Sequence, residues 1–318
     1  MSITATPARG GTMPPRPEPP ARRGLSPARL MRRAGLTGAA ALSGLAVGHW
    51  LEPAAGLLAG FAVLIAGLFL TCQGRNARNF NNTDDVEAAT DLTVLAELPE
   101  FTDTPDALAQ VLRGPDGDIA ARLQALHRHL LATSADSSPM RVAITSAESG
   151  EGRSLMAAML GRFLASRGHR VLLIDADWCD PVQHLHFHIP SAPGLADLLS
   201  RQPPGLDEVV RTDPVSGLDL ITTGTGKLSA RKLLGEPMQR LLADLSDSYE
   251  LVLLDLPPIM VAADTLLLSR IVHRLLFVVR WRHTRRNRAM GALARLRKAR
   301  GTVSGIVLTR VGNGNRAP

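Results

Sequence analysis

Aromatic residues and cysteines are scarce in this chain of 318 residues. Phe, Trp and Tyr together make up 3% of it, and its two cysteines are Cys72 and Cys179. Because these cysteines have no CxxC spacing, they predict neither a disulfide framework nor a metal cluster, and they suit a reducing compartment. Residues 80–318 also lack an aromatic stacking platform of the kind that binds single-stranded nucleic acid.

Positive charge is concentrated at the beginning of the chain. The formal net charge is +7, and residues 1–34 carry seven arginines against one glutamate, a net of +6. The remainder is nearly neutral and has no basic stripe, so nucleic acid is not an expected partner. Seven prolines and the absence of apolar periodicity predict that residues 1–34 form a disordered, Arg/Pro-rich tail.

Two hydrophobic runs without formal charge follow the tail. Leu36–Leu51 has sixteen residues and Ala54–Cys72 has nineteen. As helices they would span about 24 and 28 Å, close to the roughly 30 Å of a hydrocarbon core. Glu52-Pro53 provides a turn between them. The sequence therefore predicts a transmembrane helical hairpin over residues 35–73.

Basic residues flank this hairpin on both sides. Arg29, Arg32 and Arg33 precede the first run, and Arg75 and Arg78 follow the second. By the positive-inside rule both flanks belong in the cytoplasm. A cleaved signal peptide is the main alternative, but the second run and the lack of a convincing cleavage site oppose it. A buried hairpin of a soluble protein is opposed by the lack of any polar face.

A phosphate-loop pattern lies in the middle of the chain. A strand predicted at Val142–Thr145 leads into A-x-x-x-x-G-R-S at residues 147–154 and then into an alanine-rich helix. Backbone N–H groups and a helix N-terminus would converge there on an anion. Arg153 replaces the expected lysine, and its forked guanidinium differs in geometry from an ammonium. A glycine-rich turn alone is a weak signal, and an ordinary strand-to-helix loop is the alternative.

Two further segments support the phosphate-loop interpretation. Val171–Asp175, followed by Asp177, and Leu251–Asp255 are apolar strands that end in carboxylates. Parallel strands place such residues at the C-terminal edge of a sheet, where ligands of open α/β folds bind. Helix capping is the alternative role for a single aspartate. We expect an α/β fold, P-loop NTPase-like, with a mostly parallel sheet and helices on both faces.

These motifs resemble the cytoplasmic domain of bacterial tyrosine kinases of the polysaccharide co-polymerase group (CpsD/CapB-like), within the P-loop class that includes MinD and ParA. The resemblance covers residues 84 to 312 and includes two more strands, Phe277–Arg280 and Gly305–Leu308. It implies ATP or ADP and Mg²⁺ as cofactors. It also implies polysaccharide polymerase or export subunits of the bacterial inner membrane as partners, with the NTPase-like domain in the cytoplasm.

The resemblance assigns roles to individual residues. The nucleotide contacts that it implies are Ser149, Gly150, Glu151, Gly152, Arg153, Ser154, Leu155 and Thr309. Ser154, Asp175 and Asp255 would bind Mg²⁺. Asp175, Asp177 and Arg153 would act in phosphoryl transfer, which depends mainly on positioning and charge neutralisation.

Several positions depart from the family pattern. The basic pair that usually follows the second aspartate is Cys179-Asp180, and the asparagine that reads adenine is Thr309. The family's ring-forming Glu-x-x-Arg-x-x-Arg segment corresponds to Ala121, Gln124 and His127, so homo-oligomerisation stays open. Tyr249 is the single tyrosine, whereas autokinases of this family end in a tyrosine cluster. We expect Tyr249 to be a partly buried packing residue.

Domain boundaries follow from composition. We expect a juxtamembrane segment and linker over residues 74–117, with the part rich in Pro, Gly and Asp at 102–117. The NTPase-like domain is expected over 118–312, with a C-terminal tail at 313–318. It would begin with a helix, Ile119–Thr133, whose leucines 123, 126, 130 and 131 share one face. The histidines at 127 and 129 on that helix are expected to be solvated rather than metal ligands.

Three functions fit the sequence. The first is a membrane-anchored, tyrosine-kinase-like subunit of exopolysaccharide or capsule biosynthesis and export, regulatory and with weakened nucleotide hydrolysis. The second is an active ATPase or protein tyrosine kinase of the same family that uses Arg153. The third is a MinD/ParA-like positioning ATPase, although Glu148 stands where such proteins carry a second lysine. The polysaccharide and the partner that carries any periplasmic domain stay open.

Overall fold

The computed structural model of the chain describes residues 78–113, 117–132, 139–269 and 271–312. The predicted arginine-rich tail, the predicted hairpin over 35–73 and the C-terminal tail at 313–318 lie outside the described residues. None of the helices in the described ranges is long and apolar enough to cross a membrane.

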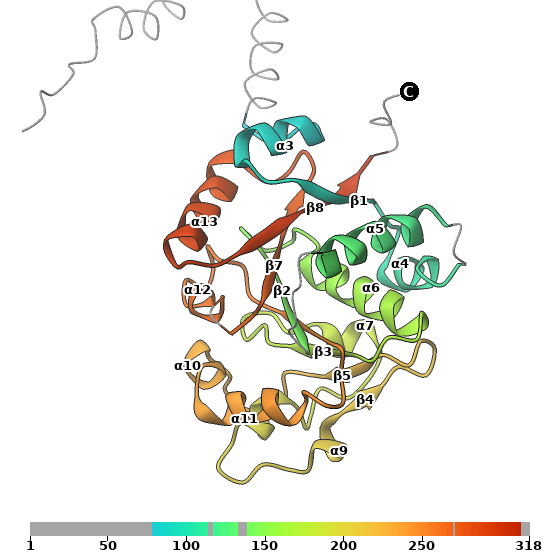
Figure 1. The fold of residues 1–318 in the computed structure, drawn as a ribbon, viewed down its shortest axis with the longest axis vertical. Helices are drawn as coiled ribbons and strands as arrows, with labels where there is room; N and C mark the ends of the chain where they lie inside the picture. The colour runs from blue at the N-terminus through green and yellow to red at the C-terminus, as the bar shows by residue number, and fades with distance from the viewer. Residues whose placement is uncertain (1–77, 114–116, 133–138, 270, 313–318) are drawn as a thin grey trace, which may run out of the picture. The chain divides into compact units, whose positions relative to one another are not determined.

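The described residues form an α/β structure around one eight-stranded sheet (Figure 1). The strand order is β1-β8-β7-β2-β6-β3-β5-β4, and every neighbouring pair is parallel except β4 and β5. The strands are β1 (Val94–Pro99), β2 (Met140–Ser146), β3 (Val171–Asp175), β4 (Arg211–Thr212), β5 (Asp219–Ile221), β6 (Leu251–Asp255), β7 (Arg274–Arg280) and β8 (Val303–Val311). The mostly parallel P-loop NTPase-like sheet expected from the sequence is confirmed.

Helices connect these strands. They are α3 (Thr83–Thr90), α4 (Thr104–Gln110), α5 (Asp118–Ala132), α6 (Arg153–Ser166), α7 (Gln183–His186), α8 (Leu195–Leu198), α9 (Leu206–Val209), α10 (Ala230–Leu233), α11 (Glu236–Asp244), α12 (Thr265–Leu268) and α13 (Arg286–Lys298). In Figure 1, α12 and α13 lie on one side of the central strands and α5 and α6 on the other. Both faces of the sheet are therefore covered.

The core has two layers, one on each face of the sheet. Successive residues of β2 alternate between them, since Val142 and Ile144 pack with α5 and α6 while Ala143 packs with α11 and α13. Both layers are apolar, which explains why the central strands read as continuous hydrophobic runs rather than as alternating patterns. This packing fixes the C-terminal ends of β2, β3 and β6 beside one another.

The structured unit begins earlier than residue 118. β1 pairs in parallel with β8 at the edge of the sheet, and α4 lies within the segment that we expected to be a linker. Asp103 caps α4 by accepting a hydrogen bond from the Asp106 N–H at 2.8 Å, a feature that the high Pro and Asp content obscured. Residues 94–110 are thus part of the fold rather than a connection to it.

Two expectations for α5 were wrong. Leu123, Leu126 and Leu130 are buried, but Leu131 is 47% exposed, since it lies about 100° around the helix from Leu130 and so at the margin of this face. His127 is not solvated: its exposed fraction is 3%, and it faces His169 with ring centroids 4.6 Å apart. The leucine face is therefore narrower than predicted, and one histidine shares it.

Candidate functional site

The phosphate loop joins β2 to α6. Gly150 and Gly152 have φ angles of 79° and 84°, in the left-handed region where a Cβ is disfavoured. A Cβ at Gly152 would also approach Thr309 Oγ1 at 3.4 Å. The glycines therefore hold the loop open at the N-terminus of α6, the arrangement that suits an anion.

Glu151 fixes the loop from within. It is 1% exposed and accepts hydrogen bonds from the Thr284 hydroxyl and from the Glu148 N–H, the latter at 2.9 Å. Its backbone carbonyl accepts from Thr309 Oγ1 at 2.6 Å. Burial raises the pKa of the Glu151 carboxyl, and these hydrogen bonds partly offset that shift. Glu151 and Thr309 thus support the loop's shape, and neither role requires a bound nucleotide.

Three aspartates form the floor beneath the loop. Asp175 and Asp255 end β3 and β6 and lie opposite each other in register, and Asp177 follows Asp175 by two residues. All three are fully buried. The structure therefore brings together the carboxylates that the sequence predicted at this edge of the sheet.

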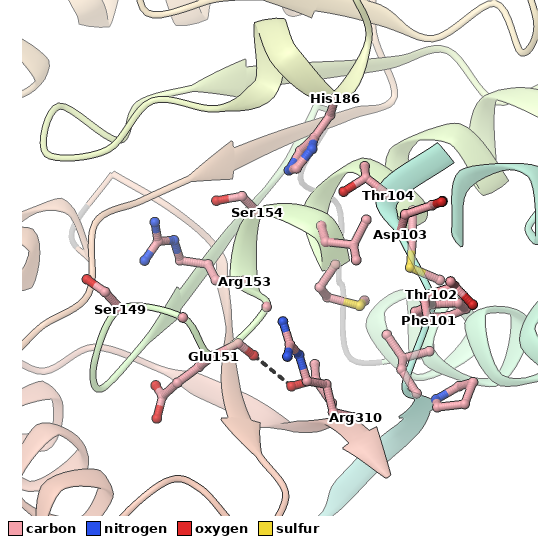
Figure 2. Close-up of a pocket in the computed structure, with 18 of the residues that line it drawn as sticks. Phe101, Thr102, Asp103, Thr104, Ser149, Glu151, Arg153, Ser154, His186 and Arg310 are labelled. Carbon is pink, nitrogen blue, oxygen red and sulfur yellow. Dashed lines mark hydrogen bonds between the residues drawn. The ribbon is translucent and has the colours of Figure 1, made fainter. Parts of the chain in front are cut away.

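Arg153 is the counter-charge of two aspartates of this floor. Its Nε lies 3.1 Å from Asp255 Oδ1, and its Nη2 pairs with Asp177 Oδ2. The side chain is only 8% exposed, and in Figure 2 its guanidinium points away from Phe101 and Asp103 on the far wall of the pocket. The two carboxylates favour the charged guanidinium more than burial disfavours it, so the pKa of Arg153 is raised. The residue at the position of the phosphate-binding lysine is thus bound to aspartates.

Gln183 completes the network, and the sequence analysis missed it. Its Nε2 donates to Asp255 Oδ2 at 2.8 Å and to the Ser154 carbonyl at 2.9 Å, and its backbone N–H donates to Asp175 Oδ2 at 3.0 Å. Its Oε1 is buried, and no described residue donates a hydrogen bond to it. The sequence signal that could have indicated Gln183 is its position just after the strand that ends in Asp175, within the part of the chain that resembles the family.

Burial also sets the protonation of the floor. It is the largest cause that raises the pKa of Asp175, to about 7, and the neighbouring Asp255 carboxylate raises it further. Burial likewise raises the pKa of Asp177, although the Arg153 charge opposes this. The site therefore combines a guanidinium with carboxyl groups, one of which takes up a proton near neutral pH.

The loop and the floor differ in how they fit Mg²⁺-ATP. The loop backbone fits a phosphate, but each carboxylate oxygen of the three aspartates already accepts a hydrogen bond from the protein. A guanidinium lies against two of those carboxylates, so the acids as arranged do not fit Mg²⁺. Among the described residues no group of three or more His, Cys, Asp or Glu side chains is placed to hold a metal. Metal binding by Ser154, Asp175 and Asp255 stays a prediction.

A cavity of about 310 Å³ opens beside the loop. Residues 149–156 of the loop and α6 line one side, and Leu98 and Pro99 at the end of β1, with residues 101–104 after it, line the other. Thr309 and Arg310 at the end of β8 close its base, and His186 lies above Ser154 in Figure 2. The sequence analysis predicted the loop and Thr309 but not this wall, because it interpreted residues 102–117 as a linker.

Tyr249 lies away from this site. It precedes β6, so it is at the opposite end of that strand from Asp255. The residue is 8% exposed, and its hydroxyl donates a hydrogen bond to Asp219 Oδ2 at 2.9 Å. Its burial was expected, and the structure confirms it.

Comparison with known proteins identifies relatives of the chain. It is 31% identical over 81% of its length to EpsB of Ralstonia solanacearum, a candidate tyrosine-protein kinase, and it covers 35% of that protein. It is 30% identical to the tyrosine-protein kinase YwqD of Bacillus subtilis, over 55% of the chain and 74% of YwqD. The chain thus spans about a third of the length of the Ralstonia relative.

Solved structures share the fold. The chimerical protein CapA2B2 superposes with a TM-score of 0.66 at 24% identity, covering 73% of this chain and all of that one. The kinase domain of the Escherichia coli tyrosine kinase ETK gives a TM-score of 0.62 at 24% identity, covering 72% of this chain and 93% of that domain.

One family description covers more than half of the chain. The CobQ/CobB/MinD/ParA nucleotide binding domain matches residues 142–318, which include the phosphate loop, the aspartates and Thr309. The chain therefore belongs to the CobQ/CobB/MinD/ParA nucleotide binding domain family, and its relatives include bacterial tyrosine-protein kinases.

Proposed function

We propose that this protein is a membrane-anchored, tyrosine-kinase-like subunit of exopolysaccharide or capsule biosynthesis, with a regulatory role and weakened nucleotide hydrolysis. The observation that carries the proposal is the contact of Arg153 with Asp177 and Asp255. A guanidinium that is paired with two buried aspartates is not available to the charge that develops on a transferred phosphoryl group. The loop can then bind a phosphate group without accelerating phosphoryl transfer.

The proposed location rests on the sequence. The hydrophobic runs before residue 73 and the arginines that flank them favour an N-in, C-in hairpin in the bacterial inner membrane. The relatives named as tyrosine-protein kinases support the kinase-like part of the proposal. The role beside polysaccharide polymerase or export subunits rests on the resemblance to the polysaccharide co-polymerase group. Reporter fusions at residues 20, 52 and 318 test the topology, and a periplasm-dependent reporter should be active only at residue 52.

An active ATPase or kinase is the second candidate. The intact loop backbone favours it, because phosphate-binding N–H groups do not depend on residue 153. A positioning ATPase of the MinD/ParA kind is less well supported. Glu148 stands at the position of that group's second lysine and has the opposite charge to a lysine. Its Oε1 lies 3.2 Å from Arg288 Nε.

Nucleotide binding and turnover separate the first two candidates. We expect the purified protein to bind ATP with an affinity that Mg²⁺ changes little, and to hydrolyse it no faster than the Asp175→Ala variant. Arg153→Lys should raise affinity or turnover on the order of tenfold, because a lysine forms a less extensive pairing with the floor and can reach a phosphate. Arg162→Lys is the matched control, since Arg162 is on the same helix and pairs with Asp213 at 2.9 Å.

The outcomes decide between the candidates. Rapid Mg²⁺-dependent turnover by the unmodified protein, abolished in Asp175→Ala, would establish the active enzyme and reject the weakened site. If Arg153→Lys and Arg162→Lys both leave affinity and turnover unchanged, Arg153 is not the cause of weak hydrolysis.

A further inference from the structure

A basic patch lies just before the start of α13, where residue 78 packs against it. It consists of Arg78, Arg282 and Arg285, all exposed, together with the half-buried Trp281. None of the ion pairs between described residues involves these three arginines. Three guanidinium groups are therefore available to an external anion.

Hydrogen bonds join residues 78–80 to residues 282–286, the two chain segments that form this patch. The Arg286 N–H donates to the Arg78 carbonyl at 2.9 Å, and the Arg282 N–H donates to the Phe80 carbonyl at 3.0 Å. Asn79 Nδ2 donates to the Arg282 carbonyl at 2.9 Å, and Arg286 Nε donates to the Asn79 carbonyl at 3.1 Å. Residues 78–80 are thus fixed against the start of α13 and do not form a loose connection.

Trp281 and the nearby acids shape the patch. The Arg282 guanidinium lies 4.1 Å from the Trp281 ring centroid, and Trp281 Nε1 donates to the Asn81 carbonyl at 2.8 Å. Tryptophan is enriched at membrane–water interfaces, and arginine is enriched in cytoplasmic segments next to membrane spans. Of the acids on the neighbouring α3, Asp85 is paired with Arg286, while Asp84 is exposed and reduces the positive potential without removing it.

Chain length limits how far this patch lies from the predicted hairpin. The second hydrophobic run ends at Cys72, six residues before Arg78. Six residues reach at most about 22 Å when fully extended. If the run spans a bilayer, the arginines at 78, 282 and 285 are thus held close to the headgroups on the cytoplasmic side, where anionic lipids attract basic residues.

We propose that the basic patch binds the anionic phospholipid headgroups of the membrane that holds the protein. The inference rests on the proposed membrane anchoring and adds to it a second contact, made by the folded domain. Lipid bound there also lies near the phosphate loop, because Arg280, next to Trp281, donates a hydrogen bond to the Gly150 carbonyl at 3.3 Å. The patch would orient the loop's edge of the sheet toward the bilayer.

Quenching of Trp281 fluorescence tests the contact in the full chain. The protein, with Trp50→Phe and Trp178→Phe, is reconstituted in phosphatidylcholine vesicles with or without phosphatidylglycerol, and both contain a headgroup-labelled quencher lipid. We expect at least about twofold stronger quenching with phosphatidylglycerol, lost in high salt because exposed charges are screened. Arg282→Glu/Arg285→Glu should abolish the difference. The control Arg231→Glu/Lys232→Glu makes the same charge change on α10 and should retain it.

Flotation of the same vesicles distinguishes the two proposals. If the chain floats with phosphatidylcholine vesicles but Trp281 is quenched equally with and without phosphatidylglycerol, anchoring stands and lipid binding by the basic patch is rejected. If the chain does not float after alkaline extraction, the membrane anchoring fails and the patch proposal falls with it. A loss of quenching in both charge-reversal variants would show a general charge effect and would also reject the patch.

Discussion

Buried ionisable groups at the two edges of the parallel sheet differ in whether they have a charged partner. At the C-terminal edge, Asp177 and Asp255 share the Arg153 guanidinium, so the buried charges are paired. At the N-terminal edge, His127 is buried beside the ring of His169, and its Nε2 has no hydrogen-bond partner within the described ranges of the chain. Burial lowers the pKa of His127, and the neighbouring His169 lowers it further. At the loop edge, burial raises the pKa of Asp175, but Arg153 and its two aspartates form paired buried charges. At the other edge, burial favours the neutral form of His127, which has no such counter-charge among the described ion pairs.

The charged cluster at the loop edge is not explained by a contribution to stability. A charged cluster is costly to bury, and replacing such a pair with apolar residues is often neutral or stabilising. Under the proposed function, the cluster at the loop edge serves phosphate binding rather than stability. Arg153 then acts as the counter-charge of Asp177 and Asp255.

Removal of Arg153 should have the largest effect. We expect Arg153→Ala to lower the free energy of unfolding by about 3–5 kcal/mol, because it leaves buried carboxylates without a counter-charge. Urea denaturation at pH 7.5 measures the change.

A double-mutant cycle provides the control for Arg153. Asp177→Asn removes one charge partner with little change of shape, so Arg153→Ala should cost clearly less in that background. Equal costs in the two backgrounds would mean that the ion pair contributes little and that lost packing explains the effect.

Much of the loop edge could be predicted from the sequence. The glycines, the alanine-rich helix and the strands that end in Asp175 and Asp255 are local patterns, and parallel pairing brings their ends together. Local pattern and sheet geometry together were sufficient for these positions. Thr309 lies far away in the sequence, and only the family resemblance supplied it.

Other features depend on tertiary contacts that no local pattern reports. Gln183 reaches Asp255 across 72 residues of sequence, and β1 joins the sheet by pairing with β8. His127 is buried because residues near the starts of β3 and β6 cover it. Arg153 was recognised as unusual, but the direction of its side chain follows from the three buried aspartates beside it. Long-range packing decided each of these cases.

Asp175 should make stability pH-dependent. Its pKa is raised from 3.8 to about 7, so the folded protein binds the proton more tightly than the unfolded chain. The contribution to stability is complete below pH 3.8 and is lost as the pH rises toward 7. We expect Asp175→Asn to remove this loss, so that its stability relative to wild type improves between pH 5 and pH 8. Urea midpoints at the two values measure it, with the exposed Asp244→Asn as control.

His127 should produce the opposite dependence at the other edge. Its pKa is lowered from 6.5, so the unfolded chain takes up the proton first and stability is lost as the pH falls below 6.5. Relative to wild type, His127→Leu should become more stable between pH 7 and pH 5, and it also removes an unpartnered nitrogen. His283→Leu, at an exposed site, should show no such trend. Parallel pH profiles for wild type and His127→Leu would contradict the buried neutral imidazole.

The smallest effect on stability is expected from a change at Tyr249, the single tyrosine of the chain, which lies at the N-terminal edge of the sheet. Its hydroxyl donates to Asp219, and burial together with this carboxylate raises the pKa of the phenol. Tyr249→Phe should cost about 1 kcal/mol, the usual value of one hydrogen bond, since Asp219 keeps its contact with Thr212 at 2.6 Å. A phosphate on that oxygen would place two negative groups against each other in a partly buried site, which costs far more than the lost bond. We therefore expect mass spectrometry of the folded protein to find Tyr249 unmodified after incubation with ATP. Stoichiometric phosphate at this residue would show that the N-terminal edge opens far enough to reach a kinase site, and the contrast between the two edges would no longer hold.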